Sequence, residues 1–346
     1  AGFYMKNRRH KMNTNIQQGK SQRRMIHGCI LMAVMTTMSV YAQQREVGIS
    51  PWGPTDEIGR LNLITPESRA AILSRIDGSA VYDLSVEYFI GMPSWQMDGG
   101  PRYQFWVTHS PRGTVIDDPR QMGREMNEHV IKTGAAVSMY THMGTHIDAL
   151  NHFGLNGKIW NGYSADEYIG DRGWKVTGAE TIPPIIARGV LIDVAAAKGV
   201  DMLSDGYRIT RQDLIDALSR QRVDLEEGDV VLVRTGRMQL YEDAVAYMAN
   251  APGLGIEAAR FVAEEGGAMV VGGDTLSFES HPSELEDDYV PLHTYFLAQR
   301  GTPILELVYL EELSNDAVYE FAFIGGSLKW RGSDAAPIRP IAIPLR

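Results

Sequence analysis

The stretch 138–154 constrains this chain more than any other part of its sequence. It places three of the nine histidines and one aspartate within eleven residues, in the order His142, His146, Asp148 and His152. Two imidazoles and a carboxylate at such close spacing are ligands that zinc, or a harder ion such as manganese, accepts. The sequence therefore predicts a divalent metal site here.

The local conformation of this stretch is expected to be irregular. The three-residue gap between His142 and His146 would put both rings on one face of a helix, but Gly144, Thr145 and Ile147 are poor helix formers. A bent loop or irregular turn fits better. Any one histidine could instead be a surface or hydrogen-bonded core residue, and it is the four ligand-capable side chains together that favour a metal site.

The N-terminal 42 residues have the layout of an export signal. They carry seven Lys or Arg and no acidic residue, and a short apolar segment ends at Val40-Tyr41-Ala42. We predict cleavage near Ala42 and a periplasmic or secreted protein, with the export route open. The apolar segment is too short and polar to favour a permanent membrane helix. Sequencing the N-terminus of protein from the exported fraction tests this; a cytosolic protein that starts at Met5 would contradict it.

Charge and cysteine content limit what the remaining chain can bind. Beyond residue 42 there are 26 basic against 43 acidic side chains, which disfavours nucleic acid and anionic membranes as partners. The only cysteine, Cys29, lies in the leader, so the mature chain would have no thiolate. Any metal must then be held by His, Asp and Glu.

The rest of the chain reads as an α/β domain. Residues 43–62 suggest an arm, and Thr65-Pro66 should begin a helix that stops near Gly78. Predicted strands and helices then alternate, which is typical of a largely buried sheet: strands at 80–86, 189–194, 229–234 and 268–271, and helices at 210–222 and 256–265. We expect a leader at 1–42, an arm and helix at 43–79, and one catalytic domain at 80–346.

Two later segments could complete the metal site. Residues 291–301 read as a short helix that carries His293, and residues 303–310 as an apolar strand with one carboxylate, Glu306. A charge in such a run is costly unless it is paired or metal-bound. Taken alone, Glu306 could equally be an exposed residue of a strand. The evidence that His293 alone is a metal ligand is weaker still.

Several other polar residues have two interpretations. Asp274 follows a predicted strand and could orient a ligand or cap the turn, whereas Arg234 could bind a carboxylate or pair with acidic neighbours. His109, His129 and His281 have no partner pattern, so they are interpreted as ordinary residues.

The motif His142-x-Gly-Thr-His146-x-Asp148-x3-His152 resembles the signature of the putative cyclase family, which includes bacterial kynurenine formamidase and isatin hydrolase. The similarity extends over most of residues 82–344, through the segments 83–85, 93–95, 188–193, 228–236, 273–275, His293 and 304–306. This resemblance implies a swivelling β/β/α fold and a dimer or larger homo-oligomer.

The resemblance also implies roles for individual residues. It makes His142, His146 and Asp148 the primary metal ligands, and His293 and Glu306 the pair that brings in a second zinc; His152 would be the catalytic acid/base and Trp95 would line the substrate pocket. The formamidase pattern has Pro-Gly after the tryptophan and Asn after the glutamate, whereas this chain has Gln96-Met97 and Leu307. Substrate and metal count, one or two ions of zinc or manganese, therefore stay open.

The predicted chemistry follows from these side chains. A metal held by neutral imidazoles and a carboxylate keeps open positions, acidifies a bound water and polarises a carbonyl. His152 could move the water's proton to the leaving group. We expect hydrolysis of an amide-like C–N bond, in an N-formyl arylamine or a strained cyclic amide. An isatin hydrolase-like or lactone-hydrolysing enzyme and a non-hydrolytic metal-binding or cyclisation protein are the alternatives.

Overall fold

The computed structural model describes residues 45–95, 99–110, 129 and 132–346 of the 346-residue chain. The chain separates into two compact units, Ala1–Glu46 and Val47–Arg346, and every described helix and strand belongs to the second unit. The expected leader at 1–42 and the departure at Gln96-Met97 lie outside the described residues. Within the described part, none of the helices has the length and apolar character needed to cross a membrane.

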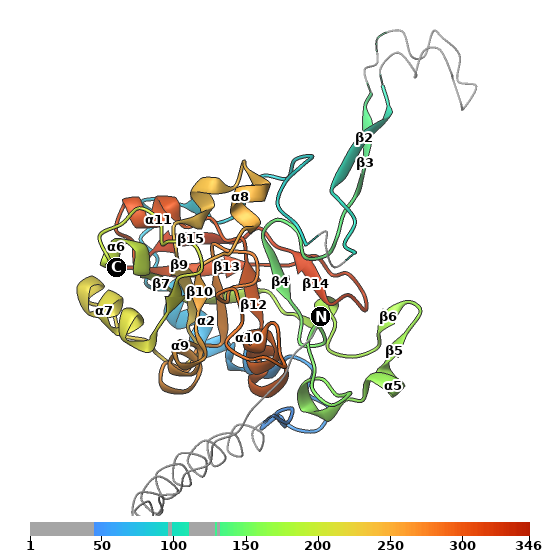
Figure 1. Ribbon diagram of the computed structural model, residues 1–346, viewed down its shortest axis with the longest axis horizontal. Helices are drawn as coiled ribbons and strands as arrows, with labels where there is room; N and C mark the ends of the chain where they lie inside the picture. Colours follow the sequence, from blue (N-terminus) through green and yellow to red (C-terminus); the bar gives the residue numbers. More distant parts are fainter. Residues whose placement is uncertain (1–44, 96–98, 111–128, 130–131) are drawn as a thin grey trace, which may run out of the picture. The chain divides into compact units, whose positions relative to one another are not determined.

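The secondary structure of the second unit consists of short helices around one large sheet (Figure 1). The helices, 3-10 and π segments are η1 (Gly59–Leu63), α2 (Pro66–Leu73), η3 (Trp160–Gly162), α5 (Ala165–Tyr168), η4 (Ala179–Thr181), α6 (Val194–Ala197), α7 (Arg211–Gln221), η5 (Arg237–Leu240), α8 (Ala244–Met248), α9 (Ile256–Arg260), η6 (Phe261–Glu265), α10 (Pro291–His293), η7 (Thr294–Arg300) and α11 (Glu311–Asn315). The strands are β1 (Tyr82–Asp83), β2 (Gln104–His109), β3 (Gly134–Ser138), β4 (His146–Asp148), β5 (Ile169–Gly170), β6 (Gly173–Trp174), β7 (Ile185–Asp193), β8 (Arg208–Ile209), β9 (Val230–Arg234), β10 (Gly253–Leu254), β11 (Val270–Gly273), β12 (Ile304–Glu306), β13 (Glu320–Gly325), β14 (Ala335–Pro337) and β15 (Ile341–Pro344).

The main sheet has nine strands in the order β1-β15-β13-β7-β9-β11-β12-β4-β14. Its centre, β7-β9-β11-β12, is parallel, and the strands on both sides of that centre run antiparallel to their neighbours. The β2–β3 hairpin is separate from this sheet and extends away from it (Figure 1). The strand order leaves β12, β4 and β14 together at one edge.

The main sheet must be strongly curled, because β14 and β15 are joined by a very short connection. Only three residues separate the end of β14 at Pro337 from the start of β15 at Ile341, and an extended chain covers at most about 14 Å in four steps. In a flat sheet the seven strand spacings between β15 and β14 would amount to about 34 Å. The two ends of the sheet are therefore brought round toward each other.

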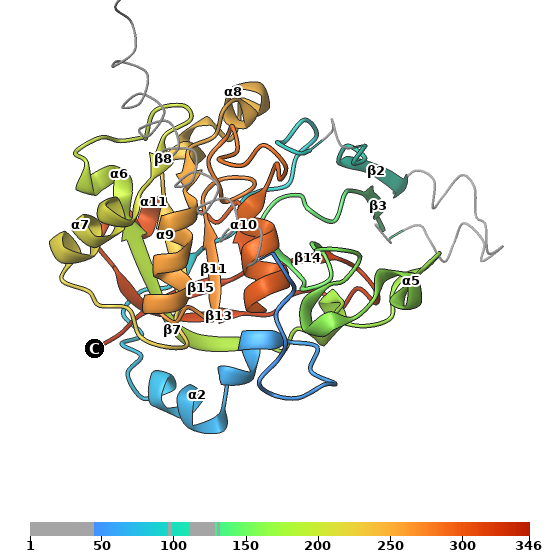
Figure 2. The ribbon, with the colours of Figure 1, turned by 60° about the horizontal axis from the view of Figure 1, so that its bottom comes forward.

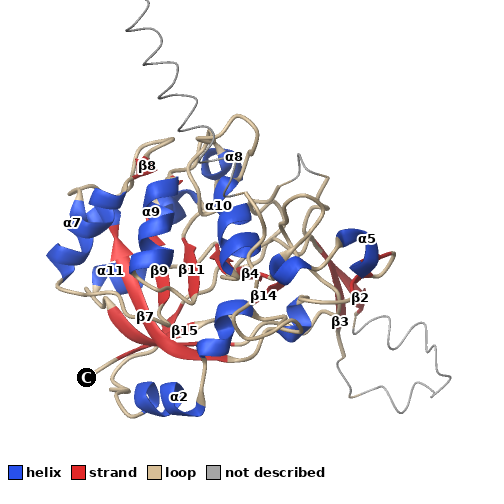
Figure 3. Cartoon of the chain, turned by 90° about the horizontal axis from the view of Figure 1, so that it is seen from below, coloured by secondary structure: helices blue, strands red, loops and turns tan. Residues whose placement is uncertain are grey.

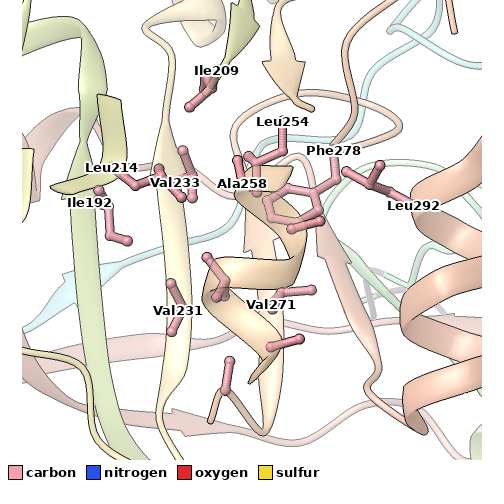
Figure 4. Close-up of a cluster of buried hydrophobic side chains, with 14 of the residues drawn as sticks. Ile192, Ile209, Leu214, Val231, Val233, Leu254, Ala258, Val271, Phe278 and Leu292 are labelled. Atoms are coloured by element: carbon pink, nitrogen blue, oxygen red, sulfur yellow. The ribbon is translucent and has the colours of Figure 1, made fainter. Parts of the chain in front are cut away.

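Alternating side chains of the central strands build two hydrophobic cores. Val231 and Val233 of β9 belong to one cluster, together with residues of α7, α9 and η7, and Val230 and Leu232 belong to the other. The period of two is that of a strand buried on both faces. Figure 4 shows the first cluster, and Figure 2 shows α7, α9 and α10 on this face. On the second face α2 lies against β7 (Figure 3), and Leu61 of η1 belongs to the second cluster.

Helices with a clear capping signal form where the sequence predicts them. In α7 the Thr210 side chain accepts from the Asp213 backbone and the Asp213 side chain accepts from the Thr210 backbone, as a capping box does. Thr65 and Ser68 cap α2 in the same way, but the expected end near Gly78 is wrong. The helix stops at Leu73 because Ile76 pairs as a β-bridge with Leu345.

Two predicted strands are shorter than expected. The strand predicted at 80–86 contains only Tyr82 and Asp83, because the Asp83 side chain accepts from the backbone N–H of Ser85 and turns the chain. The strand predicted at 303–310 ends at Glu306, because Leu307 has a left-handed backbone with φ of 51°. The predicted helix at 291–301 forms as α10 and the π segment η7, which Gly301 ends.

Candidate metal centre

A sharply bent loop leads into the metal-binding motif, as the sequence predicts. Gly144 has φ of 62°, and a Cβ atom there would lie 2.2 Å from Cζ of Tyr88, so no larger residue fits without displacing that ring. The hydroxyl of Thr145 accepts from Val86 N (2.9 Å) and donates to the carbonyl of Leu307 (2.7 Å). The loop is thereby fixed to the residue that follows Glu306.

Strand pairing brings three of the predicted ligands onto one face. His146 and Asp148 are two residues apart on β4, so their side chains point the same way, and Glu306 of β12 lies directly opposite His146. All three side chains are buried. Nε2 of His146 lies 3.5 Å from Oδ1 of Asp148 and 3.4 Å from Oε2 of Glu306. The expected approach of Glu306 to the motif is confirmed.

His293 reaches the same cluster from the end of α10. Its Nε2 lies 3.6 Å from Oδ2 of Asp148 and 3.2 Å from Oε1 of Glu306. Its Nδ1 lies 2.7 Å from Oε1 of Glu279, a buried carboxylate that also accepts from the backbone N–H of Leu292. Glu279 therefore orients the His293 ring so that Nε2 faces the two other carboxylates.

The hydrogen bonds of the His146 and His293 rings determine which nitrogen of each ring carries the lone pair. Nδ1 of His146 lies 2.8 Å from the carbonyl oxygen of Gly144, to which it can only donate, and Nδ1 of His293 likewise donates to Glu279. In the neutral rings both Nε2 atoms are then acceptors, although they face carboxylate oxygens. Such acceptors repel the carboxylates unless a positive charge, either a proton on Nε2 or a cation, lies between them.

The polar atoms of the cluster are spaced as metal ligands would be. Nε2 of His146, Oδ2 of Asp148 and Oε1 of Glu306 are buried without a hydrogen-bond partner. The four nitrogen–oxygen separations, 3.2 to 3.6 Å, compare with roughly 3.3–3.4 Å between donors of a tetrahedral ion with bonds of about 2.0–2.1 Å. These residues fit a zinc-sized divalent ion.

His142 extends the cluster. Its Nδ1 lies 2.8 Å from Oδ1 of Asp148, and together with His146 these residues form a buried group of potential metal ligands. Burial lowers the pKa of His142, but the carboxylates of Asp148 and Asp334 outweigh this effect and raise the pKa to about 10. Glu279 and Glu306 likewise raise the pKa of the buried His293 well above its ordinary value. The carboxylates around His142 and His293 thus favour positive charge within this cluster.

The predicted acid/base, His152, lies beside the ligands and has a different environment. Its ring centroid is 3.9 Å from that of His142, and its side chain is 17 % exposed. Burial, followed by the charge of the neighbouring histidines, lowers the pKa of His152 well below its usual range. A histidine that is neutral at pH 7 can accept a proton.

The predicted pocket residue Trp95 stands edge-on to His281, with ring centroids 5.9 Å apart. His281 has no partner pattern in the sequence, but its pKa is lowered by burial and by the nearby His293, and its Nε2 lies 2.7 Å from Oγ of Ser277. His281 therefore lies next to the cluster. The sequence does not predict this position, because a single histidine has no recognisable ligand spacing.

Other candidate residues have structural roles. The Arg234 guanidinium is buried and pairs with Asp193 (3.1 Å) and Glu311 (2.6 Å). Asp274 accepts from Thr235 N (2.9 Å) and Oγ1 (2.8 Å) and from Gly236 N (2.7 Å), so it caps this turn. His109 belongs to the β2–β3 hairpin, and His129 is exposed.

Replacing Asp274 with Ala is expected to destabilise the fold by about 3 kcal/mol. The substitution leaves the Thr235 and Gly236 donors buried without a partner, and each such group costs roughly 1–3 kcal/mol. Denaturant unfolding should show the loss, with Asp216→Ala as a control, because Asp216 bonds only at the exposed surface to Gln212. A change within about 0.5 kcal/mol, as for ordinary surface positions, would contradict the capping role.

Several known proteins are similar to this chain in sequence or fold. A solved structure described as a novel cyclase is 26 % identical, with a TM-score of 0.75, and the match covers 86 % of this chain and 99 % of that one. Isatin hydrolase A from Ralstonia solanacearum is 21 % identical with a TM-score of 0.57, over 77 % of this chain and 92 % of that one. The rice (Oryza sativa subsp. japonica) cyclase-like protein 3 is 24 % identical over 270 residues, 77 % of this chain and 80 % of its own length.

The similar structures confirm the mixed α/β fold with a curled sheet that the sequence resemblance implied. The model of the family described as putative cyclase matches residues 82–280, which contain the whole histidine–aspartate motif and Glu279. The chain belongs to the putative cyclase family.

Proposed function

We propose that this chain is a metal-dependent hydrolase that cleaves an amide-like C–N bond of a small molecule. One observation carries the proposal: the acceptor nitrogens of His146 and His293 face the carboxylates of Asp148 and Glu306 beside a neutral His152. Such a site holds a cation and a base side by side, which is what hydrolysis of an unactivated carbonyl compound requires.

The ion would be held by His142, His146, Asp148, His293 and Glu306, and the nitrogen and oxygen donors suit zinc or manganese. When bound, such an ion acidifies a water molecule and polarises a carbonyl. The buried outer partner Glu279 keeps Nε2 of His293 turned toward the cluster.

His152 supplies the proton transfers. Its Nδ1 faces Asp334, which leaves Nε2 to take a proton from the attacking water. In the reaction the water's OH group becomes bonded to the carbonyl carbon, the C–N bond breaks, and the leaving nitrogen receives the proton that His152 has held. No oxidant, reductant or further reactant is needed for this balance.

The aromatic surroundings favour a planar substrate. Trp95 and His281 stand edge-to-face, and Phe153 lies 5.0 Å from the His293 ring. Aromatic side chains in this arrangement pack well against a flat ring. An N-formyl arylamine or a cyclic amide such as isatin is the proposed class, and the similar fold of the isatin hydrolases supports it.

A hydrolysis screen in ¹⁸O-labelled water tests the proposal. Protein loaded with zinc or with manganese is incubated with N-formylkynurenine, isatin and small lactones, and the products are examined by mass spectrometry. Incorporation of one labelled oxygen into an amide-derived acid supports the proposal, and chelated protein is the control. Turnover of lactones alone would show that the substrates are cyclic esters and not amides. An unlabelled rearranged product would indicate cyclisation.

Export of the protein and its assembly into a homo-oligomer stay predictions.

A further inference from the structure

We propose that Asp334 is a positioning residue that fixes the ring protons of both His142 and His152. Asp334 lies just before β14, and its Oδ2 is 3.4 Å from Nε2 of His142 and 3.8 Å from Nδ1 of His152. One carboxylate thus faces both a predicted metal ligand and the proposed base. Asp334 also lies outside the residues that the family model matches.

The Asp334 carboxylate is held in place from two sides. Oγ1 of Thr141 donates to its Oδ1 at 3.0 Å, and its backbone carbonyl accepts from Ala149 N at 2.9 Å. Thr141 directly precedes His142 and Ala149 directly follows Asp148, so the carboxylate is fixed to the segment that carries the histidines. The remaining oxygen, Oδ2, is directed at the two rings.

The His142 ring needs an acceptor on this side. When Nδ1 of His142 binds the ion beside Asp148, the proton of the neutral ring resides on Nε2, which is buried without a hydrogen-bond partner. A buried N–H without an acceptor is costly. Asp334 is the carboxylate nearest to that nitrogen, and contacts of this kind often shorten when an active site is filled.

The same carboxylate selects the useful tautomer of His152. A proton on Nδ1, directed at Asp334, leaves the lone pair on Nε2, where the proposed proton transfer needs it. A carboxylate that holds a catalytic imidazole in one tautomer can contribute strongly to turnover even though it never touches the substrate. Asp334 would therefore influence metal affinity and the position of the His152 ring proton together.

Three substitutions separate this role from a merely structural one. Asp334→Asn keeps the size of the side chain but presents an amide that can donate, Asp334→Ala removes both oxygens, and Asp334→Glu keeps the charge. Asp83→Asn is the matched control, because Asp83 is a half-exposed carboxylate that contacts Ser85 and Arg339. The measurements on the full mature chain are the dissociation constant for zinc, the ¹⁵N chemical shifts of the histidine rings and thermal unfolding.

We expect Asp334→Asn and Asp334→Ala to weaken zinc binding by roughly 10–100-fold, as loss of an outer partner of a ligand usually does. The His152 ring nitrogens should shift from the Nδ1–H toward the Nε2–H pattern in both variants. Asp334→Glu should recover part of both effects, and Asp83→Asn should change neither. Unchanged zinc affinity and unchanged ring shifts in folded Asp334→Asn would overturn the proposal.

One further measurement, of kcat at saturating metal, rests on the proposed function. A loss of about 10–100-fold in kcat for Asp334→Asn would support the link to His152. If the wild type hydrolyses none of the substrates while zinc affinity and ring shifts still respond to Asp334, the hydrolase assignment fails and the positioning role of Asp334 stands. A loss confined to thermal stability would instead show a structural role only and overturn the proposal.

Discussion

Replacing His146 with Ala is expected to abolish tight metal binding and activity together. His146 is fully buried, and its Nε2 faces both Asp148 and Glu306, so the substitution removes a nitrogen donor from the centre of the cluster. His146 belongs to the primary set of His142, His146 and Asp148, and its loss leaves two of these ligands, fewer than the three that tight zinc binding needs. Metal content after dialysis and turnover should therefore fall in parallel to background.

Unfolding has to be excluded as the cause of such a loss. His146→Ala leaves two buried carboxylates facing each other without a compensating charge, which can destabilise the protein. His146→Gln keeps more of the volume and should lose metal as well, with circular dichroism as the check on folding. His109→Ala, in the β2–β3 hairpin, is the control that should keep both metal and turnover. A folded His146 variant with one tightly bound ion would refute the assignment.

Replacing His152 with Ala should leave the metal in place but lower kcat by roughly 10²–10⁴-fold, the usual contribution of general acid–base catalysis. His152 lies beside His142 and is partly exposed, and its Nδ1 is 3.8 Å from Oδ2 of Asp334. The wild type should show an acidic limb in its pH–rate profile, below the ordinary imidazole pKa because burial lowers the pKa of His152. The variant should lack this limb.

Metal stoichiometry and kcat are measured on the same preparation of His152→Ala. Together they show whether His152 is a metal ligand or a proton-transfer residue. If the variant loses metal as completely as His146→Ala, then His152 is a ligand and another group must move the proton. If turnover stays near normal, the water needs no help from this residue. His281→Ala is a useful comparison, because His281 lies next to the cluster but is not expected to transfer the proton.

The elements that the sequence predicts best are those with a local chemical signal. The Thr210–Asp213 capping box defines the start of α7, and the apolar run at 230–234 forms β9. The strand predicted at 303–310 is too long because its end depends on the left-handed backbone of Leu307, an unusual conformation for a branched apolar residue. The curl of the sheet depends on pairing between strands that are distant in the sequence. Such pairing cannot be predicted from any short segment alone.

Some residues of the metal centre can be predicted from the sequence, and others cannot. The two-residue spacing of His146 and Asp148 matches the period of a strand, so their common direction could have been derived from spacing alone. Glu306 and His293 are found through the family resemblance, since they lie about 150 residues from the motif. Glu279 and Asp334 are missed because an isolated acidic residue is usually solvated, and only the fold places them against histidines.

The position of β4 in the sheet also bears on the order in which the protein can be built during synthesis. β4 carries His146 and Asp148, but both of its neighbours, β12 and β14, come more than 150 residues later in the chain. At about 5–20 residues per second, β4 waits roughly 8–30 s for a strand to pair with. Meanwhile β7, β9 and β11 emerge in order and can pair with one another. We therefore expect the parallel centre to form before the metal-binding edge, so that ion capture is a late event in folding.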